Sequence, residues 1–121
     1  MRRTLRFSAA VAACLCTGAI AKAAVELNTY ADKEGYLDVQ ALTCAELANT
    51  YQEDANYLTA WYSGWYNGLA KKHYANIPGS KAAEHEAIVY CKEHPGDEKV
   101  IKVLGRIFDE YREKKGIEIQ R

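Results

Sequence analysis

The chain lacks the sequence patterns on which most catalytic and nucleotide-binding sites depend. It contains no Gly-x-Ser-x-Gly motif, no pair of histidines at metal-ligand spacing and no glycine-rich phosphate loop. Its histidines, His73, His85 and His94, stand beside charged residues or a proline, which is typical of solvated side chains or of partners for a helix C-terminus. The sequence therefore argues against an enzyme and indicates no cofactor.

Long apolar runs and basic clusters are also absent beyond the N-terminal segment. No later stretch approaches the roughly 20 apolar residues that a membrane-spanning helix needs. No clustered basic face is indicated, so nothing favours a nucleic-acid partner. There is no repeat, long linker or low-complexity tract, so one domain of about 98 residues is expected once the N-terminal segment is removed.

Residues 1–23 have the organisation of a cleaved secretory signal peptide. Arginines near the N-terminus form a basic n-region, residues 7–20 form an apolar h-region, and Ala21-Lys22-Ala23 has small residues at the two positions that a signal peptidase reads. We expect cleavage after Ala23 and an exported, soluble mature chain. An alternative reading takes Val11-Ala12-Ala13-Cys14 as a lipobox with Cys14 acylated, but the apolar segment before that cysteine would be very short.

Cleavage changes the charge balance. The full chain has 16 basic and 16 acidic residues, and the signal removes four basic residues and no acid, which leaves a net charge of −4 with histidine neutral. With every carboxylate protonated, the remaining basic residues, the histidines and the α-amino group would carry +16. Acidification therefore reverses the charge and increases repulsion within and between chains.

Two cysteines remain after cleavage, Cys44 and Cys91. Two cysteines in an exported chain permit a single intramolecular pairing, so we expect a disulfide between them. For a loop of roughly 50 residues, the chain-entropy estimate is on the order of 4 kcal/mol, a large contribution for so small a domain. A reduced pair or a metal site at Cys91-x-x-His94 is the alternative, and the lack of further ligands nearby argues against the metal.

The segment 56–74 is the most distinctive part of the sequence, because it holds both tryptophans of the chain together with several tyrosines. Apolar residues at helical spacing form a stripe that we expect to be core: Leu58, Trp61, Trp65 and Leu69. Tyr62 and Tyr66 lie one position round the helix. Gly64 and Gly68 form a Gly-x-x-x-Gly step that lets another backbone come close. So many rings on a short helix also indicate an adhesive surface, and both readings stay open.

The remaining signals predict an all-α fold, a single small domain of four helices stapled by one disulfide. An irregular arm is expected over residues 24–42, followed by a helical domain over residues 43–116 and a frayed tail over residues 117–121. Thr43 and Glu46 form a capping box that starts a short first helix, from Cys44 to about Thr50.

The aromatic helix is the second, entered through Glu53 and Asp54, whose charges suit a helix N-terminus. Residues 76–79 are expected to form a loop, after which Ser80 caps a third helix over residues 81–93. Its inward side chains are expected to be Ala83, Ala87, Ile88 and Cys91.

The fourth helix is expected over residues 98–115, with Asp97 as its cap and Gly116 as its end. Its apolar stripe is formed by Val100, Leu104, Ile107 and Tyr111. The disulfide would then join the first helix to the third.

The short sequence motifs around Cys44 and Cys91 resemble those of a known family. Leu42-Thr43-Cys44-Ala45-Glu46 starts the first predicted helix, and Val89-Tyr90-Cys91-Lys92-Glu93-His94-Pro95 closes the third. With a tryptophan- and glycine-containing helix between them and a signal peptide in front, the pattern over residues 42–108 resembles the HdeA/HdeB periplasmic acid-stress proteins. The segment 60–68 is richer in aromatic residues and glycine than that pattern, so the chain resembles a divergent member.

The resemblance implies an ATP-independent periplasmic chaperone, a homodimer near neutral pH that opens in acid and keeps acid-unfolded periplasmic proteins soluble. We expect its client-binding surface on the aromatic helix, at Tyr57, Leu58, Trp61, Tyr62, Trp65, Tyr66 and Leu69. A carboxylate whose pKa is lowered by folding stabilises the fold above its unfolded pKa and loses that effect in acid. The candidate pH sensors at predicted helix starts are Glu46, Glu53, Asp54 and Asp97.

A binding module with one dedicated partner is the competing function. The segment Trp65-Tyr66-Asn67-Gly68 in a small exported helical chain is similar to the Rap/Tai immunity proteins, which neutralise toxin effectors in the periplasm. Tyrosine and tryptophan suit an interface hot spot as well as a chaperone surface. The additional cysteines of that family are missing here. A structural envelope protein without regulated binding is the third interpretation.

Overall fold

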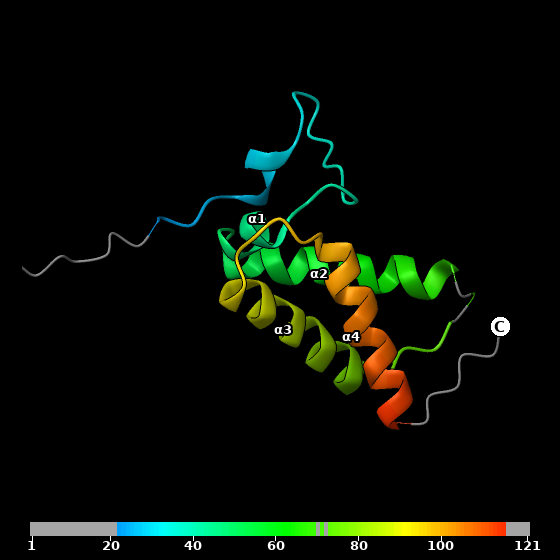
Figure 1. The fold of residues 1–121 in the computed structure, drawn as a ribbon. Coiled ribbons are helices and arrows are strands. Elements are labelled where there is room, and N and C mark those ends of the chain that lie inside the picture. The colour runs from blue at the N-terminus through cyan, green and yellow to red at the C-terminus, as the bar shows by residue number, and fades with distance from the viewer. Residues whose placement is uncertain (1–21, 70, 72, 116–121) are drawn as a thin grey trace, which may run out of the picture.

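The computed structural model describes residues 22–69, 71 and 73–115 of the chain. The expected signal peptide up to residue 21, with Cys14, and the expected helix end and tail at 116–121 lie outside these residues. The described part forms a short 3-10 helix, η1 (Leu27–Tyr30), and four α-helices, which confirms the expected all-α fold with a short first helix (Figure 1). The helices are α1 (Cys44–Ala48), α2 (Gln52–Leu69), α3 (Ile77–Glu93) and α4 (Val100–Lys115).

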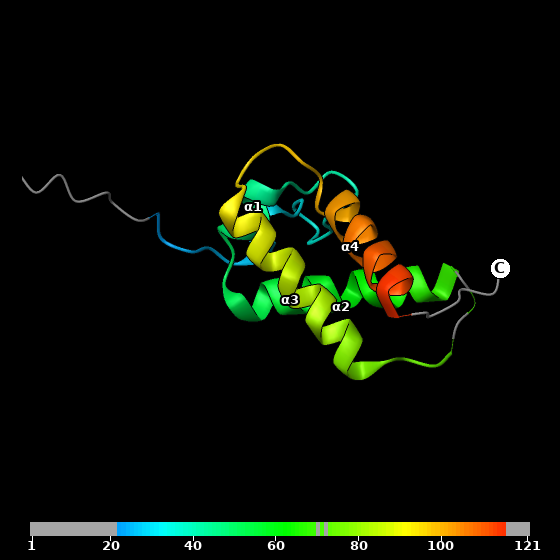
Figure 2. The same cartoon turned by 60° about the horizontal axis from the view of Figure 1, so that its bottom comes forward.

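α3 and α4 pack against each other and cross the same side of α2, while α1 lies against α3 (Figures 1 and 2). Within the described ranges, none of these helices combines the length and apolarity that a membrane span needs. The buried side chains form one core, made of Leu27, Leu42, Cys44, Leu47, Ala55, Leu58, Tyr62, Ala83, Ala87, Ile88, Cys91, Val100, Val103, Leu104 and Ile107.

α1 begins with the predicted capping box. The Thr43 hydroxyl accepts a hydrogen bond from the Glu46 amide at 3.3 Å, and the Glu46 carboxylate accepts one from the Thr43 amide at 2.8 Å. The first amides of the helix also donate outward, Cys44 to the Glu98 carbonyl at 2.8 Å and Ala45 to the Gly96 carbonyl at 3.1 Å. The free backbone N–H groups at the start of α1 are therefore paired partly with side chains of the capping box and partly with carbonyls of the loop between α3 and α4.

The expected disulfide joins Cys44 of α1 to Cys91 of α3. Their Cα atoms lie 4.6 Å apart and both side chains are fully buried. The predicted link between the first and third helices is confirmed. Because Cys91 is covalently bonded to Cys44, it is not a thiolate ligand for a metal at Cys91-x-x-His94.

The start of α3 differs from the expectation. Residues 76–79 are not a loop, because Asn76 is the N-cap and its side chain accepts a hydrogen bond from the Gly79 amide at 3.0 Å. Pro78 stands in the first turn, where the missing N–H costs nothing and the fixed φ suits a helix. A Cβ at Gly79 would lie 3.1 Å from the Asn76 oxygen, so glycine allows the cap to close. Ser80 is therefore not the cap.

The start of α4 also differs. Sequence reasoning placed its first residue at Glu98 with Asp97 as the cap, whereas the helix begins at Val100. The backbone groups at this point form hydrogen bonds with other segments instead of with α4. The Val100 amide donates to the Leu42 carbonyl at 3.0 Å, and the Glu98 carbonyl accepts a hydrogen bond from the Cys44 amide of α1. The predicted stripe is otherwise confirmed, with Val100, Leu104 and Ile107 buried and Tyr111 half-buried.

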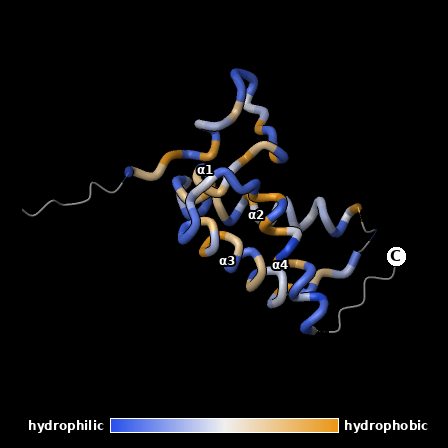
Figure 3. Tube along the Cα trace, viewed as in Figure 1, coloured by the Kyte–Doolittle hydropathy of each residue, from blue (hydrophilic) through white to orange (hydrophobic). Residues whose placement is uncertain are grey.

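The buried face of α2 is not the predicted stripe. Leu58 is buried as expected, but Trp61 is 41% exposed and Leu69 is 66% exposed. In Figure 3 α2 is mostly pale, because tyrosine, tryptophan and glycine have intermediate hydropathy, so hydropathy distinguishes its faces poorly. The face that packs is instead formed by Ala55, Leu58, Thr59, Tyr62 and Ser63.

Two small polar residues explain this choice of face. The Thr59 hydroxyl donates to the Ala55 carbonyl at 2.9 Å, which satisfies it within its own helix. The Ser63 hydroxyl lies 3.1 Å from the Thr59 carbonyl and 2.7 Å from the Glu84 carboxylate of α3. Burial therefore leaves neither hydroxyl unpaired, and small side chains allow α3 to approach closely. A tryptophan on this face would keep α3 farther away.

The N-terminal arm is attached to the helices at both ends. Val25 forms a parallel bridge with Thr50, its amide donating to the Asn49 carbonyl at 2.9 Å and its carbonyl accepting from Tyr51 at 3.1 Å. Further along, the Lys99 ammonium donates to the Ala41 carbonyl at 2.8 Å. Leu27 of η1 is buried, so the arm contributes to the core although it is mostly irregular.

Loss of the disulfide is expected to lower the free energy of unfolding by about 4 kcal/mol, because a loop with a sequence separation of 47 regains its freedom in the unfolded chain. Urea unfolding at neutral pH compares the oxidised mature chain with the Cys44→Ala/Cys91→Ala double variant. A reductant should leave the double variant unchanged. Equal stabilities of the two oxidised proteins would contradict a structural role for the link.

Replacing the observed cap, Asn76→Ala, is expected to lower the free energy of unfolding by about 1 kcal/mol, because the Gly79 amide loses its acceptor. Ser80→Ala is the matched control and should stay within about 0.5 kcal/mol of the wild type. Chemical denaturation of the two variants measures both effects. The reverse order of stabilities would restore Ser80 as the cap.

Candidate functional site

The aromatic residues of α2 are divided between opposite faces. Tyr62 is buried, and its hydroxyl donates to the Val39 carbonyl of the arm. Burial, with a smaller contribution from the negative charge of Asp38, raises the pKa of the Tyr62 hydroxyl well above its usual range. Tyr57 points away from the core and is 67% exposed. Of the seven expected client-binding residues, Leu58 and Tyr62 are therefore core residues of the folded chain.

An aromatic surface covers the exposed side of α2, and we define it as Tyr57, Trp61, Gly64, Trp65, Gly68 and Leu69. The Trp61 and Trp65 rings stack at 6.2 Å between centroids with an angle of 16°. A Cβ at Gly64 or Gly68 would have no described atom within 4 Å, so the expected close approach of another backbone is not made within the chain. No charged residue follows Asp54 in α2. The six residues of the surface are thus apolar and carry no charge.

Tyr66 is held against α4 and is not part of this surface. Its ring stacks on Phe108 with centroids 5.8 Å apart, and the Arg112 guanidinium lies 4.1 Å from the ring centroid. The Tyr66 hydroxyl also accepts a hydrogen bond from Arg112 and contacts Asp109 at 3.2 Å. Trp65 is half-buried and lines a small gap beside the same part of α4. These contacts fix the angle at which α2 and α4 cross.

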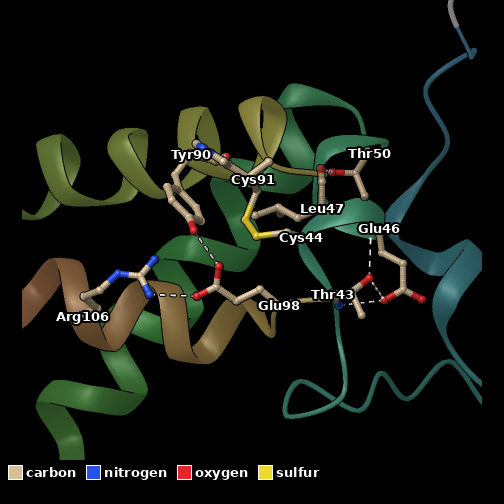
Figure 4. Close-up of a disulfide and its surroundings, with 10 residues drawn as sticks. Thr43, Cys44, Glu46, Leu47, Thr50, Tyr90, Cys91, Glu98 and Arg106 are labelled. Atoms are coloured by element: carbon tan, nitrogen blue, oxygen red, sulfur yellow. Dashed lines mark hydrogen bonds and ion pairs between the residues drawn. A yellow bond between two sulfur atoms is a disulfide. The ribbon is translucent and has the colours of Figure 1, made fainter. Parts of the chain in front are cut away.

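A charged cluster lies next to the disulfide (Figure 4). The Glu98 carboxylate accepts a hydrogen bond from the Tyr90 hydroxyl at 2.7 Å and pairs with the Arg106 guanidinium at 2.8 Å. The Arg106 guanidinium also lies 5.0 Å from the centroid of the Tyr90 ring, and His94 stacks on that ring at 4.4 Å. Glu98 therefore joins α3, through Tyr90, to α4, through Arg106.

The cluster makes Glu98 an acid-sensitive contact. The hydrogen bond from Arg106, followed by the one from Tyr90, holds the pKa of the Glu98 carboxyl below its usual value. A carboxyl with a lowered folded-state pKa stabilises the fold fully above its unfolded pKa, about 4.3 for glutamate, and loses that contribution as pH falls through the folded value. The contact is therefore intact at neutral pH and is lost as the pH falls through the lowered pKa of the folded chain.

The family model described as the HdeA/HdeB family matches residues 6–101, well over half of the chain. The chain belongs to the HdeA/HdeB family. Searches of curated proteins and of solved structures found no match. HdeA/HdeB proteins are periplasmic acid-stress chaperones, so the match supports that general kind of function.

The HdeA/HdeB match contains both cysteines and the whole of α2, and it ends at Ile101, one residue into α4. The contacts that Phe108 and Arg112 make with Tyr66 therefore lie outside the matched range. In this member the crossing of α2 and α4 depends on residues beyond the family pattern.

The four carboxylates expected to sense pH fall into two groups. Glu46 accepts hydrogen bonds in the capping box, and Asp54 accepts one from the Leu27 amide at 2.7 Å, which ties η1 to α2. Glu53 and Asp97 are exposed and make no hydrogen bond or ion pair within the described ranges. Sequence reasoning missed Glu98, because its partners come from α3 and α4 and no local spacing indicates them.

Glu98→Gln is expected to lower stability at neutral pH, because the charge-assisted contacts with Arg106 and Tyr90 are weakened. The difference from the wild type should disappear as pH falls well below the unfolded pKa of glutamate, about 4.3, where the wild-type carboxyl is also neutral. Urea unfolding across a pH series measures the effect. Glu34→Gln, which removes an exposed acid of the arm, is the control and should track the wild type at every pH. A Glu98→Gln deficit that is independent of pH would contradict the acid-sensitive contact.

Proposed function

We propose that the protein is an ATP-independent acid-stress chaperone of the periplasm that enlarges its aromatic surface at low pH and prevents aggregation of acid-unfolded proteins. The observation that carries the proposal is the uncharged, half-exposed face of α2 in a chain of the HdeA/HdeB family. The resting state in this proposal is a homodimer near neutral pH, as the family resemblance implies.

Acid acts on the contacts that carboxylates make between elements. Glu98 links α3 to α4, Glu46 caps α1, and Asp54 holds η1 on α2. A neutral carboxyl group is a weaker acceptor than a carboxylate, so the Glu98 link between α3 and α4 loosens once that acid is protonated. The mature chain at the same time changes from a net charge of −4 to one approaching +16, which favours expansion.

The buried residues behind the aromatic surface would then become accessible. Leu58 and Tyr62 lie under the arm, where Tyr62 donates to the Val39 carbonyl. Movement of the arm would add these two side chains to Tyr57 and Trp61 and would form a larger apolar surface for unfolded clients. The disulfide limits the opening, because α1 and α3 remain joined in acid.

The end of α4 would keep the complex of the chaperone and its bound client soluble. Residues 109–115 contain three acids and three bases, and only the bases keep their charge once the acids are neutral. A positively charged segment beside the bound client would keep complexes apart.

The double variant Tyr57→Ser/Trp61→Ser is expected to lose roughly half or more of the suppression of client aggregation at about pH 3, because two exposed anchors are removed. Light scattering of an acid-labile protein, with and without the oxidised mature chain, measures this at acid and neutral pH. The control Tyr74→Ser/Ile77→Ser removes two exposed apolar residues elsewhere and should behave as the wild type. Sedimentation at both pH values follows the homodimer.

The wild type should suppress aggregation in acid and not at neutral pH. Failure to suppress at either pH, with the fold and disulfide intact, would contradict the chaperone function. Tight binding of one periplasmic protein at neutral pH would instead favour a dedicated partner.

A further inference from the structure

A groove of about 450 Å³ opens between the N-terminal arm and the first half of α2, where the arm stands above these helices in Figure 1. The α2 wall is one helical face, Asp54, Tyr57, Leu58 and Trp61, at i, i+3, i+4 and i+7 spacing. The arm wall is formed by Leu27, Asn28, Ala31, Gly35, Tyr36, Leu37 and Val39. Three aromatic residues and one carboxylate thus line a mostly apolar groove.

The arm wall is held in shape by its own hydrogen bonds. The Asp32 carboxylate accepts from the Glu34 amide at 3.0 Å and from the Tyr36 amide at 2.9 Å. Gly35 takes a φ of 87°, a left-handed conformation that favours glycine, and this allows the Asp32 amide to reach the Tyr36 carbonyl at 2.9 Å. The turn therefore presents Tyr36 at the edge of the groove before any ligand binds.

The opposite side of the groove is fixed to the arm by Asp54. Its carboxylate accepts a hydrogen bond from the Leu27 amide at 2.7 Å, so the negative charge is held at the wall and is only partly exposed. Tyr62 donates to Val39 behind the same wall. A pre-formed groove loses little conformational entropy on binding a small ligand.

The part of the chain that builds the groove is strongly acidic. Residues 24–58 contain seven acidic residues and one basic residue, Lys33, whereas the rest of the mature chain contains nine acidic and eleven basic residues. Three of the four acids of the arm, Asp32, Glu34 and Asp38, lie within the segment that carries the groove wall. The local field therefore favours a positively charged ligand.

We infer that this groove binds a small organic cation with an apolar body, of which a quaternary ammonium compound is the simplest example. Aromatic rings attract cations through their faces, and Tyr36, Tyr57 and Trp61 supply rings beside the Asp54 charge. The size of the groove suits a small molecule, since such sites measure about 300–1,000 Å³, whereas a protein partner needs about 800 Å² of surface on each side. This binding is separate from the chaperone function, because it uses the folded, neutral form.

Choline and its neutral isostere 3,3-dimethylbutan-1-ol test the inference directly, because the two differ in charge and hardly in shape. Each is titrated into the mature, oxidised chain at neutral pH, and the indole N–H resonance of Trp61 is followed by NMR. Choline should shift this resonance saturably at millimolar concentration, and the isostere should bind about tenfold more weakly. Equal binding of the two compounds, or no saturable shift with choline, would overturn the inference.

Two variants locate the site. Asp54→Asn keeps an acceptor for the Leu27 amide but removes the charge, and it should weaken choline binding about fivefold. Glu53→Gln removes the neighbouring exposed acid, which does not line the groove, and should change binding little. Circular dichroism checks the fold of both variants, and the comparison of choline with its isostere on the wild type decides the question even if a variant unfolds. A basic peptide that shifts Trp61 when choline does not would assign the groove to a protein segment and overturn the inference.

Discussion

The covalent link between Cys44 and Cys91 is the constraint on which the packing of α1 against α3 depends. α1 has five residues, too few to be stable alone, and it keeps its position because one end is bonded to α3 and its first amides donate to the loop before α4. The same link holds the end of α3, where Tyr90 reaches Glu98. Protonation of Glu98 weakens its noncovalent contact with Tyr90. The disulfide does not titrate, so α1 and α3 stay covalently joined.

The helical fold could be predicted wherever a local sequence pattern is compatible with only one structure. The capping box at Thr43 and the apolar stripe of α4 are of this kind, and both are found as expected. The start of α3 could not be read in the same way, since Pro78 before a glycine indicates a turn as readily as a first helical turn. The start of α4 depends on tertiary contacts, because the Glu98 carbonyl accepts a hydrogen bond from the Cys44 amide of α1.

The candidate site was harder to predict than the fold. Helical spacing favours Trp61 and Leu69 as core residues, but in α2 the hydroxyls of Thr59 and Ser63 are satisfied by carbonyls of the same helix, and both side chains are buried. Trp61 is left exposed as a consequence. The seven-residue client surface on this helix stays a prediction, and its separation into core and exposed residues required the structure. Glu98 could not be found from sequence spacing, since its two partners meet only in the folded chain.

The two sides of the proposed chaperone differ in what holds them together, and this determines where acid opens it. Around α1 and α3 the carboxylates of Glu46 and Glu98 accept hydrogen bonds, but the disulfide and the backbone hydrogen bonds join the chain without them. The arm is attached to α2 through Asp54 and Tyr62, and to the residues between α1 and α2 by a backbone bridge at Val25. Its segment carries most of its charge as acid. Neutralising the acids of this segment removes its local negative field. The arm should therefore move before α1 and α3 separate, and the first new surface exposed would be Leu58 and Tyr62 beside the aromatic surface.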